Sequence, residues 1–263
     1  MFGFLGNGKS SFINTCKYVW DEGEFINHTG ASGDHGGHTL MRIAYPLTKT
    51  ITLVDNRGCA KLNSFETGEL YAQLANLLPL NDQVEWLKGS QLVEKIKQTE
   101  RYVRASDFIF PVLVHSVKMS LTPEEINIFR RLLPNARDIT GIFPIVVLTH
   151  KTKGNVAEQE KIFRNLGVER IFSFENYTNR DHIKTRGRHE DVLKFLLEVI
   201  KDVQFQIAQT REPERDLLLR KKMLYNLISQ QTEEEQRQKL EERKLRQKMG
   251  QLRRPGGRGY DNE

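Results

Sequence analysis

The sequence predicts an α/β fold in which a mostly parallel sheet carries helices on both faces and a long charged helix follows. Two observations predict the sheet. Strand-like apolar segments alternate with helical segments from Gly3 to about Ile200, and the run 143–149 is almost continuously apolar. A third observation predicts the final helix, because residues 211–249 are almost entirely Arg, Lys, Glu, Gln, Leu and Met. With 263 residues, of which 38% are hydrophobic, the chain is long enough to bury one good core.

Five segments are expected to form strands, because they are rich in β-branched or apolar residues and end near turn residues. They are 40–47, 50–55, 108–115, 143–149 and 170–174. Pro46 should end the first of them. Pro111 lies inside the third and has no N–H for a ladder, so we expect an edge position or a bulge there.

Helices are expected where apolar residues recur at helical spacing, and the clearest start is Thr122, followed by proline and two acids. The expected helical ranges are 11–16, 69–78, 122–133, 155–166 and 190–203, with a polar helical insertion at 79–103. The domain prediction is therefore a nucleotide-binding-like domain at 1–203, a charged helical extension at 204–250 and a disordered tail at 251–263. Because the extension sustains no run of heptads, its sequence favours a solvated helix with one packed turn over a coiled coil.

A phosphate-binding motif stands almost at the first residue. The segment Gly3-Phe4-Leu5-Gly6-Asn7-Gly8-Lys9-Ser10 matches G-x-x-x-x-G-K-[ST], the phosphate loop of nucleotide hydrolases, and Ser11 continues into a helix. Its glycines let successive N–H groups face phosphate oxygens. The expected ligands are Gly3, Gly6, Asn7, Gly8, Lys9, Ser10 and Ser11, with Lys9 on the outer phosphates and Ser10 on Mg²⁺. A glycine-rich turn without a ligand is the alternative interpretation, which the later motifs weaken.

A second motif, Asp55-Asn56-Arg57-Gly58, directly follows a predicted strand. In nucleotide switches, the aspartate of D-x-x-G lies near Mg²⁺ through water and the glycine N–H senses the γ-phosphate. An ordinary Asx turn is the alternative. Thr39 follows a stretch rich in glycine and histidine that predicts a mobile loop, and it is the best candidate for the threonine that completes the Mg²⁺ site.

Together the motifs predict Ser10, Thr39 and Asp55 as metal ligands and Lys9, Thr39 and Gly58 as catalytic residues. Thr29 and Ser32 compete with Thr39 for its role. No residue is clearly placed to orient the attacking water.

The base site is expected after the fourth and fifth strands. Thr149-His150-Lys151-Thr152 stands where a guanine site usually reads N/T-K-x-D, so Thr152 replaces the carboxylate that accepts hydrogen bonds from guanine. Asn176 in Phe174-Glu175-Asn176 is placed to contact a base edge, and His150 to stack on the ring. The nucleotide ligands predicted here are Thr149, His150 and Asn176.

The order of these motifs resembles that of the septin-like branch of P-loop GTPases. The motifs are the segment from Gly3 to Asn14, D-x-x-G, Thr-His and Phe-Glu-Asn. Within that branch, the chain is most similar to the avirulence-induced-gene and immunity-associated type and to the chloroplast Toc receptors. The resemblance covers about residues 3–200. It implies a three-layer P-loop fold, Mg²⁺-dependent GTP binding with slow hydrolysis, nucleotide-gated dimerisation through this domain and often a C-terminal helical or membrane-directed extension. Three departures are Arg57, Thr152 and the missing or vestigial strand before the loop. The missing strand predicts a truncated or alternatively started chain, in which the strands on either side of the missing one have exposed edges.

The leading functional prediction is a GTP-binding switch with slow Mg²⁺-dependent hydrolysis, in which Arg57 acts as an internal or cross-dimer arginine. The alternative is an interaction module that no longer binds nucleotide, and Thr152 keeps a third reading, an ATP-binding protein, open. The predicted partners are guanine nucleotide, a second copy through the same domain and an unknown protein at the C-terminal helix. The net charge of +6 permits contact with a membrane surface, whereas glutamates interleaved in the basic region argue against nucleic acid.

Two cysteines make no disulfide framework, so a reducing cytoplasm is expected, and no apolar run reaches the length of a membrane span.

Overall fold

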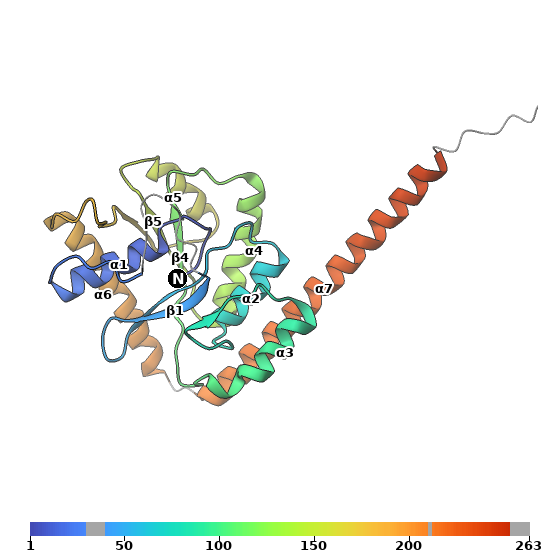
Figure 1. Ribbon diagram of the computed structural model, residues 1–263, viewed down its shortest axis with the longest axis horizontal. Coiled ribbons are helices and arrows are strands. Elements are labelled where there is room, and N and C mark those ends of the chain that lie inside the picture. Colours follow the sequence, from blue (N-terminus) through green and yellow to red (C-terminus); the bar gives the residue numbers. More distant parts are fainter. Residues whose placement is uncertain (30–39, 210–211, 253–263) are drawn as a thin grey trace, which may run out of the picture.

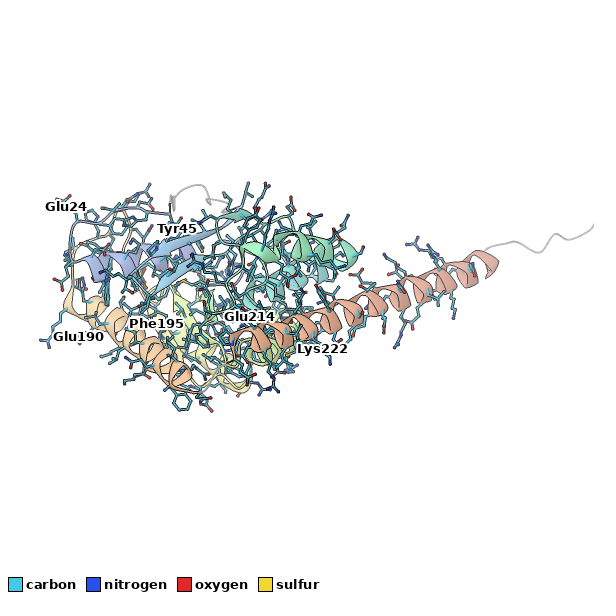
Figure 2. All side chains as sticks on the ribbon, turned by 90° about the horizontal axis from the view of Figure 1, so that it is seen from below. Glu24, Tyr45, Glu190, Phe195, Glu214 and Lys222 are labelled. Carbon is cyan, nitrogen blue, oxygen red and sulfur yellow. The ribbon has the colours of Figure 1, made fainter. Side chains whose placement is uncertain are left out.

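The computed structural model describes residues 1–29, 40–209 and 212–252, and these form an α/β structure from which one long helix projects (Figures 1 and 2). In chain order the elements are α1 (Lys9–Asp21), β1 (Met41–Pro46), β2 (Thr52–Asp55), α2 (Ser64–Leu74), β3 (Asp82–Gln83), α3 (Gly89–Thr99), the 3-10 helix η1 (Glu100–Tyr102), β4 (Val112–Ser116), α4 (Pro123–Thr140), β5 (Ile145–Thr149), α5 (Val156–Asn165), β6 (Ile171–Phe174), α6 (Arg186–Ala208) and α7 (Pro213–Leu252).

The described strands form two three-stranded sheets of opposite character. β4, β5 and β6 are parallel, whereas β1 pairs antiparallel with both β2 and β3. The prediction of a mostly parallel sheet therefore holds only for the second half of the fold. The antiparallel half arises because β1 and β2 are joined by a short turn, in which the N–H of Leu47 bonds the carbonyl of Ile51 at 2.9 Å.

Residues 2–5 pair with β4 on one side and with Cys59, four residues after the end of β2, on the other. The N–H and carbonyl of Phe2 each bond β4, at 2.9 and 2.8 Å, and Phe2 lies opposite Leu113 in parallel register. On the other side, Leu5 donates to the carbonyl of Cys59 at 2.8 Å and Cys59 donates to that of Gly3 at 3.1 Å. The expectation of exposed strand edges beside the phosphate loop is therefore wrong for β4, with which Phe2 pairs, whereas among the described strands β2 pairs with β1 alone.

β4 is the edge strand of the β4-β5-β6 sheet, as Pro111 predicts, although Phe2 pairs with part of its outer side. β4 begins one residue later, at Val112, and lies between Phe2 and β5. Pro111 needs no N–H at this point, because it precedes the ladder and contributes only its carbonyl, which accepts from the N–H of Ile145 at 3.2 Å. A proline just before the strand therefore costs the ladder no hydrogen bond.

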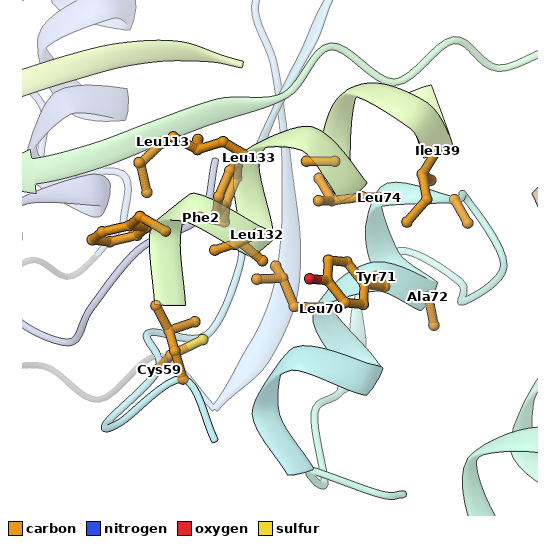
Figure 3. Close-up of a cluster of buried hydrophobic side chains, with 14 of the residues drawn as sticks. Phe2, Cys59, Leu70, Tyr71, Ala72, Leu74, Leu113, Leu132, Leu133 and Ile139 are labelled. Atoms are coloured by element: carbon orange, nitrogen blue, oxygen red, sulfur yellow. The ribbon is translucent and has the colours of Figure 1, made fainter. Parts of the chain in front are cut away.

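Both faces of the parallel sheet are buried. Val112 and Val114 pack with α1 and α6, whereas Leu113 between them packs with α2 and α4 on the opposite face. Figure 3 shows Phe2 on the same face of the sheet as Leu113, in a cluster with residues of α2 and α4. The continuous apolar character of the strands, rather than an alternating one, follows from this two-sided burial.

The helix starts agree with capping chemistry. Thr122 accepts from the N–H of Glu125 at 3.2 Å, and the Glu125 carboxylate accepts from the N–H of Thr122 at 2.8 Å, so the predicted start of α4 is confirmed as a capping box. α2 begins at Ser64, five residues before the expected start, because Asn63 caps its first N–H groups.

The helical insertion is shorter than predicted. Only 89–102 is helical, whereas 79–88 contains β3 and an irregular turn in which Trp86 has a φ of 58°.

The charged extension is helical, but its predicted boundaries shift. α6 continues to Ala208, so the expected boundary at 203/204 falls inside a helix, and α7 includes residues 251–252 of the expected tail. The rest of that tail, 253–263, lies outside the described residues.

α7 packs on α2, α3 and α4 through buried Leu224 and Ile228, whereas every side chain at 236–247 is exposed (Figure 2). Within the described residues, no helix is both long and apolar enough to cross a membrane.

Candidate functional site

The phosphate loop is shaped by glycines in the left-handed region. Gly6 and Gly8 have φ values of 75° and 81°, and Gly8 is the N-cap of α1. A β-carbon on Gly3 would lie 2.3 Å from the carbonyl oxygen of Val114, so that position also requires glycine. No side chain caps the first turn of α1 and no acid lies in it, so its N-terminal N–H groups and helix dipole favour an anion.

Lys9 lies inside this loop with only 6% of its surface exposed. Its Nζ donates to the carbonyl oxygens of Phe4 at 3.0 Å and Gly3 at 3.4 Å. Burial holds the pKa of Lys9 below its ordinary value, and the nearby carboxylate of Asp55 opposes that shift. A β-carbon on Gly58 would lie 2.9 Å from Lys9 Nζ, so the structure brings these two predicted catalytic residues together.

Two of the three predicted metal ligands are also in contact. The hydroxyl of Ser10 donates to Oδ2 of Asp55 at 2.6 Å, and Asp55 is 1% exposed at the end of β2. Thr39 lies outside the described residues, as do Ser32 and most of the loop predicted to be mobile. Its competitor Thr29 is described, and its hydroxyl donates to the carbonyl oxygen of Ser10 at 3.3 Å.

A cation bound between Ser10 and Asp55 would need further oxygen ligands from water or phosphate. Across residues 1–29, 40–209 and 212–252, no group of three or more His, Cys, Asp or Glu side chains is gathered for a metal. A magnesium ion that retains waters and binds phosphate oxygens needs only one or two protein groups, so the pair of Ser10 and Asp55 fits such an ion.

The ends of β5 and β6 are attached to the phosphate loop. The Thr149 hydroxyl donates to the carbonyl of Asn7 at 2.8 Å, and the Asn176 amide donates to that of Gly8 at 3.4 Å. A side chain on Gly8 would contact both, because its β-carbon would lie 3.3 Å from the Thr149 hydroxyl and 3.4 Å from the Asn176 amide nitrogen. Both residues therefore support the loop, whereas the sequence predicted contacts with the base.

Ser11 is part of the first turn of α1, where its carbonyl oxygen accepts from the Thr15 hydroxyl at 2.8 Å. The N–H groups of a first helical turn have no partner within the helix, so that of Ser11 is a candidate donor to a phosphate.

His150 follows β5 in a left-handed backbone conformation, with a φ of 59°. Its Nδ1 lies 3.0 Å from the Ser116 hydroxyl and 3.1 Å from that of Thr149, and partial burial lowers its pKa. The imidazole is therefore predominantly neutral at pH 7. A neutral ring fixed at one edge is suited to packing against a planar base.

Glu175 is a candidate site residue that the sequence reasoning missed. Its Oε2 accepts from the N–H of Thr152 at 3.0 Å and from the Thr152 hydroxyl at 2.7 Å. A half-buried carboxylate from the end of β6 thus lies beside the position where the usual aspartate is missing. The available signal was that Glu175 directly precedes Asn176 at the end of a predicted parallel strand.

Comparisons with known proteins add nothing to this geometry: no protein-family model matches the chain, and no curated protein is found to be similar. The resemblance to septin-like GTPases therefore stays a prediction, and the function has to be inferred from the residues described above.

Proposed function

We propose that this protein binds GTP together with Mg²⁺ and hydrolyses it slowly, as a nucleotide-dependent switch. The observation that carries the proposal is the phosphate loop itself. A glycine-shaped loop leads into an uncapped helix N-terminus, with Lys9 beside Gly58 and the Ser10 hydroxyl on Asp55. Phosphoryl transfer depends mainly on positioned positive charge and N–H donors, and this arrangement provides both.

The strand order supports a P-loop fold with three layers. Residues 2–5 pair with β4 on one side and with Cys59, four residues after β2, on the other, and the N-terminal amine of Met1 donates to the carbonyl of Val54 in β2 at 2.7 Å. Counted as a short strand, they give the proposed order β3-β1-β2, then 2–5, then β4-β5-β6. The phosphate loop then leaves from a strand between the two sheets and enters α1. Ligands of α/β sheets bind at the carboxyl ends of strands where connections diverge, which is where this loop lies.

Mg²⁺ is proposed to bind at Ser10 and Asp55, with Thr39 as the third protein group. When bound, such an ion neutralises charge on the outer phosphates. Lys9 then contacts the phosphates directly, for which its Nζ must exchange the Phe4 and Gly3 carbonyls for phosphate oxygens. Gly58 lies beside Lys9, and its N–H is proposed to sense the γ-phosphate.

Guanine specificity is proposed to come from Glu175. A carboxylate accepts hydrogen bonds from the two adjacent N–H groups of guanine, which adenine does not present. Thr152 cannot supply this acceptor, but it fixes Glu175 through two hydrogen bonds at 2.7 and 3.0 Å. His150 is proposed to stack on the base.

Partners follow as further parts of the proposal. Assembly of two copies through the nucleotide-binding domain would be gated by GTP, and α7 would recruit a protein partner through its exposed outer half. Size-exclusion chromatography with GDP and with a non-hydrolysable GTP analogue tests the first, because gated assembly predicts a dimer only with the analogue.

The activity is tested by the release of inorganic phosphate from GTP and from ATP over several hours. We expect slow release from GTP that requires Mg²⁺ and is lost in Asp55→Asn, with much less from ATP. The variant Asp138→Asn, which removes an exposed carboxylate of α4, is the matched control and should behave as wild type. Equal release from GTP and ATP would refute guanine specificity, and no release from either by folded protein would refute the proposed hydrolysis.

A further inference from the structure

Arg57, the second residue after Asp55, contacts the segment between β3 and α3. Its Nη1 donates to the carbonyl oxygen of Val84 at 2.7 Å, and its guanidinium carbon lies 5.3 Å from the centre of the Trp86 ring. The guanidinium is thus bonded and stacked on the segment between β3 and α3. An arginine held in this way anchors the loop that carries it, because both contacts lie outside that loop.

The main chain of Val84 has a second contact. Its N–H donates to the carbonyl oxygen of Leu40 at 3.0 Å, and Val84 is 2% exposed. Leu40 directly follows Thr39, the predicted third ligand of Mg²⁺. One buried residue therefore bonds two segments: the Asp55–Gly58 loop through its carbonyl and the chain entering β1 through its N–H.

The segment 84–88, called here the bracket, is itself fixed to α2. The Glu69 carboxylate accepts from the N–H of Leu87 at 2.8 Å and from that of Glu85 at 3.4 Å, and Glu69 is 1% exposed. Trp86 adopts a φ of 58°, which a bulky residue keeps only when its surroundings require it. These contacts attach the bracket to α2 and leave the indole ring beneath Arg57.

We propose that Arg57 is a positioning residue that couples the Asp55–Gly58 loop to Leu40, just before β1, through the bracket. The inference rests on the proposed GTP-dependent switch and deepens it. When Gly58 bonds a γ-phosphate, Arg57 moves with it, and the shared residue Val84 transmits that movement to Leu40. Arg57 therefore supplies geometry rather than charge to the phosphate, since its guanidinium already has partners.

Trp86 provides a direct readout, because its ring contacts Arg57. In a Trp20→Phe background, Trp86 is the sole tryptophan of the chain. We expect its emission to differ between saturating GDP and a saturating non-hydrolysable GTP analogue, each with Mg²⁺. Arg57→Ala should abolish that difference and lower kcat about 10-fold or more, while KM for GTP changes less than about 3-fold.

Two further variants separate positioning from other roles. Arg57→Lys retains a donor and a cation for Trp86 and should restore part of both readouts. Arg101→Ala removes another arginine stacked on an aromatic ring, that of Tyr102 at 4.8 Å, and should leave both readouts as in wild type. The melting temperature of each variant shows whether the chain is folded.

The proposal is overturned if the analogue binds with normal affinity, measured with a labelled nucleotide, yet Trp86 emission is the same in both nucleotides. It is also overturned if Arg57→Ala retains wild-type kcat. A third contradicting result is a kcat that rises with protein concentration, together with rescue of the Arg57→Ala variant by added wild-type protein. Such rescue would assign Arg57 to the phosphate bound by a partner copy. Absence of any nucleotide binding refutes the proposed function itself and this inference with it.

Discussion

Phe2 tests whether residues 2–5 are an integral strand of the fold. The side chain is 1% exposed within the cluster shown in Figure 3, and its main chain is bonded to β4. Full burial of a phenylalanine contributes up to about 3 kcal/mol through transfer from water. If about 60 Å³ remains unfilled after Phe2→Ala, the cavity adds about 1.4 kcal/mol at 24 cal/mol per Å³. We therefore expect the free energy of unfolding to fall by about 4 kcal/mol.

Urea unfolding followed by circular dichroism measures this loss. A loss of that size corresponds to a decrease in Tm of about 8–16 °C, at about 2–4 °C per kcal/mol for a chain of this length. Phe205→Ala, at a phenylalanine of α6 that is 64% exposed, is the matched control and should change stability by less than about 0.5 kcal/mol. A loss below about 1 kcal/mol for Phe2→Ala would show that this segment does not hold the two sheets together.

The remaining predictions concern three buried positions. Arg42→Met should destabilise the fold by about 2–3 kcal/mol in urea, because the buried guanidinium donates to the Gln73 carbonyl of α2 at 3.1 Å; unchanged stability would contradict this role. Gly58→Ala should cost about 1–3 kcal/mol and weaken GTP binding, since its β-carbon would lie 2.9 Å from Lys9 Nζ; normal GTP affinity would contradict it. Burial lowers the pKa of His115, so the unfolded chain binds the proton more strongly, and the free energy of unfolding decreases as the pH is lowered below about 6.5. His115→Gln should make this decrease smaller. An identical pH profile of stability for wild type and variant would refute the assignment.

The strands that the sequence predicts are those with a strong apolar signal. The range 143–149 was expected from its continuous apolar run, and β5 is found there at Ile145–Thr149, buried on both faces. β3 was missed because it consists of only Asp82 and Gln83, which show no periodic pattern. The role of residues 2–5 was missed for a related reason: pairing of so short a segment depends on strands more than 50 residues away in sequence.

In the candidate site, too, residues in local motifs were predicted and contacts between distant residues were not. Lys9, Ser10 and Asp55 were predicted from motifs whose spacing is local, and the structure places them together. Two tertiary contacts had no local signal: Glu175 with Thr152, which are 23 residues apart, and Arg57 with Val84, which are 27 apart. Asn63, which begins α2, did have a signal, because Glu66 follows it three residues later in the pattern of a helix start.

The measurement that tests the central claim most directly is calorimetric titration of the full chain with GTP, in Mg²⁺ and in EDTA, for wild type, Lys9→Ala and Lys222→Ala. Lys222 is exposed on α7 and serves as the control. Loss of a charged hydrogen-bonding group at the phosphates costs about 1.5–3 kcal/mol, or roughly 10- to 150-fold in affinity. We predict saturable, Mg²⁺-dependent binding that Lys9→Ala weakens by this factor and Lys222→Ala leaves unchanged. Equal GTP binding by wild type and Lys9→Ala, or no binding by folded wild-type protein, would contradict the assignment of residues 3–10 as a nucleotide site.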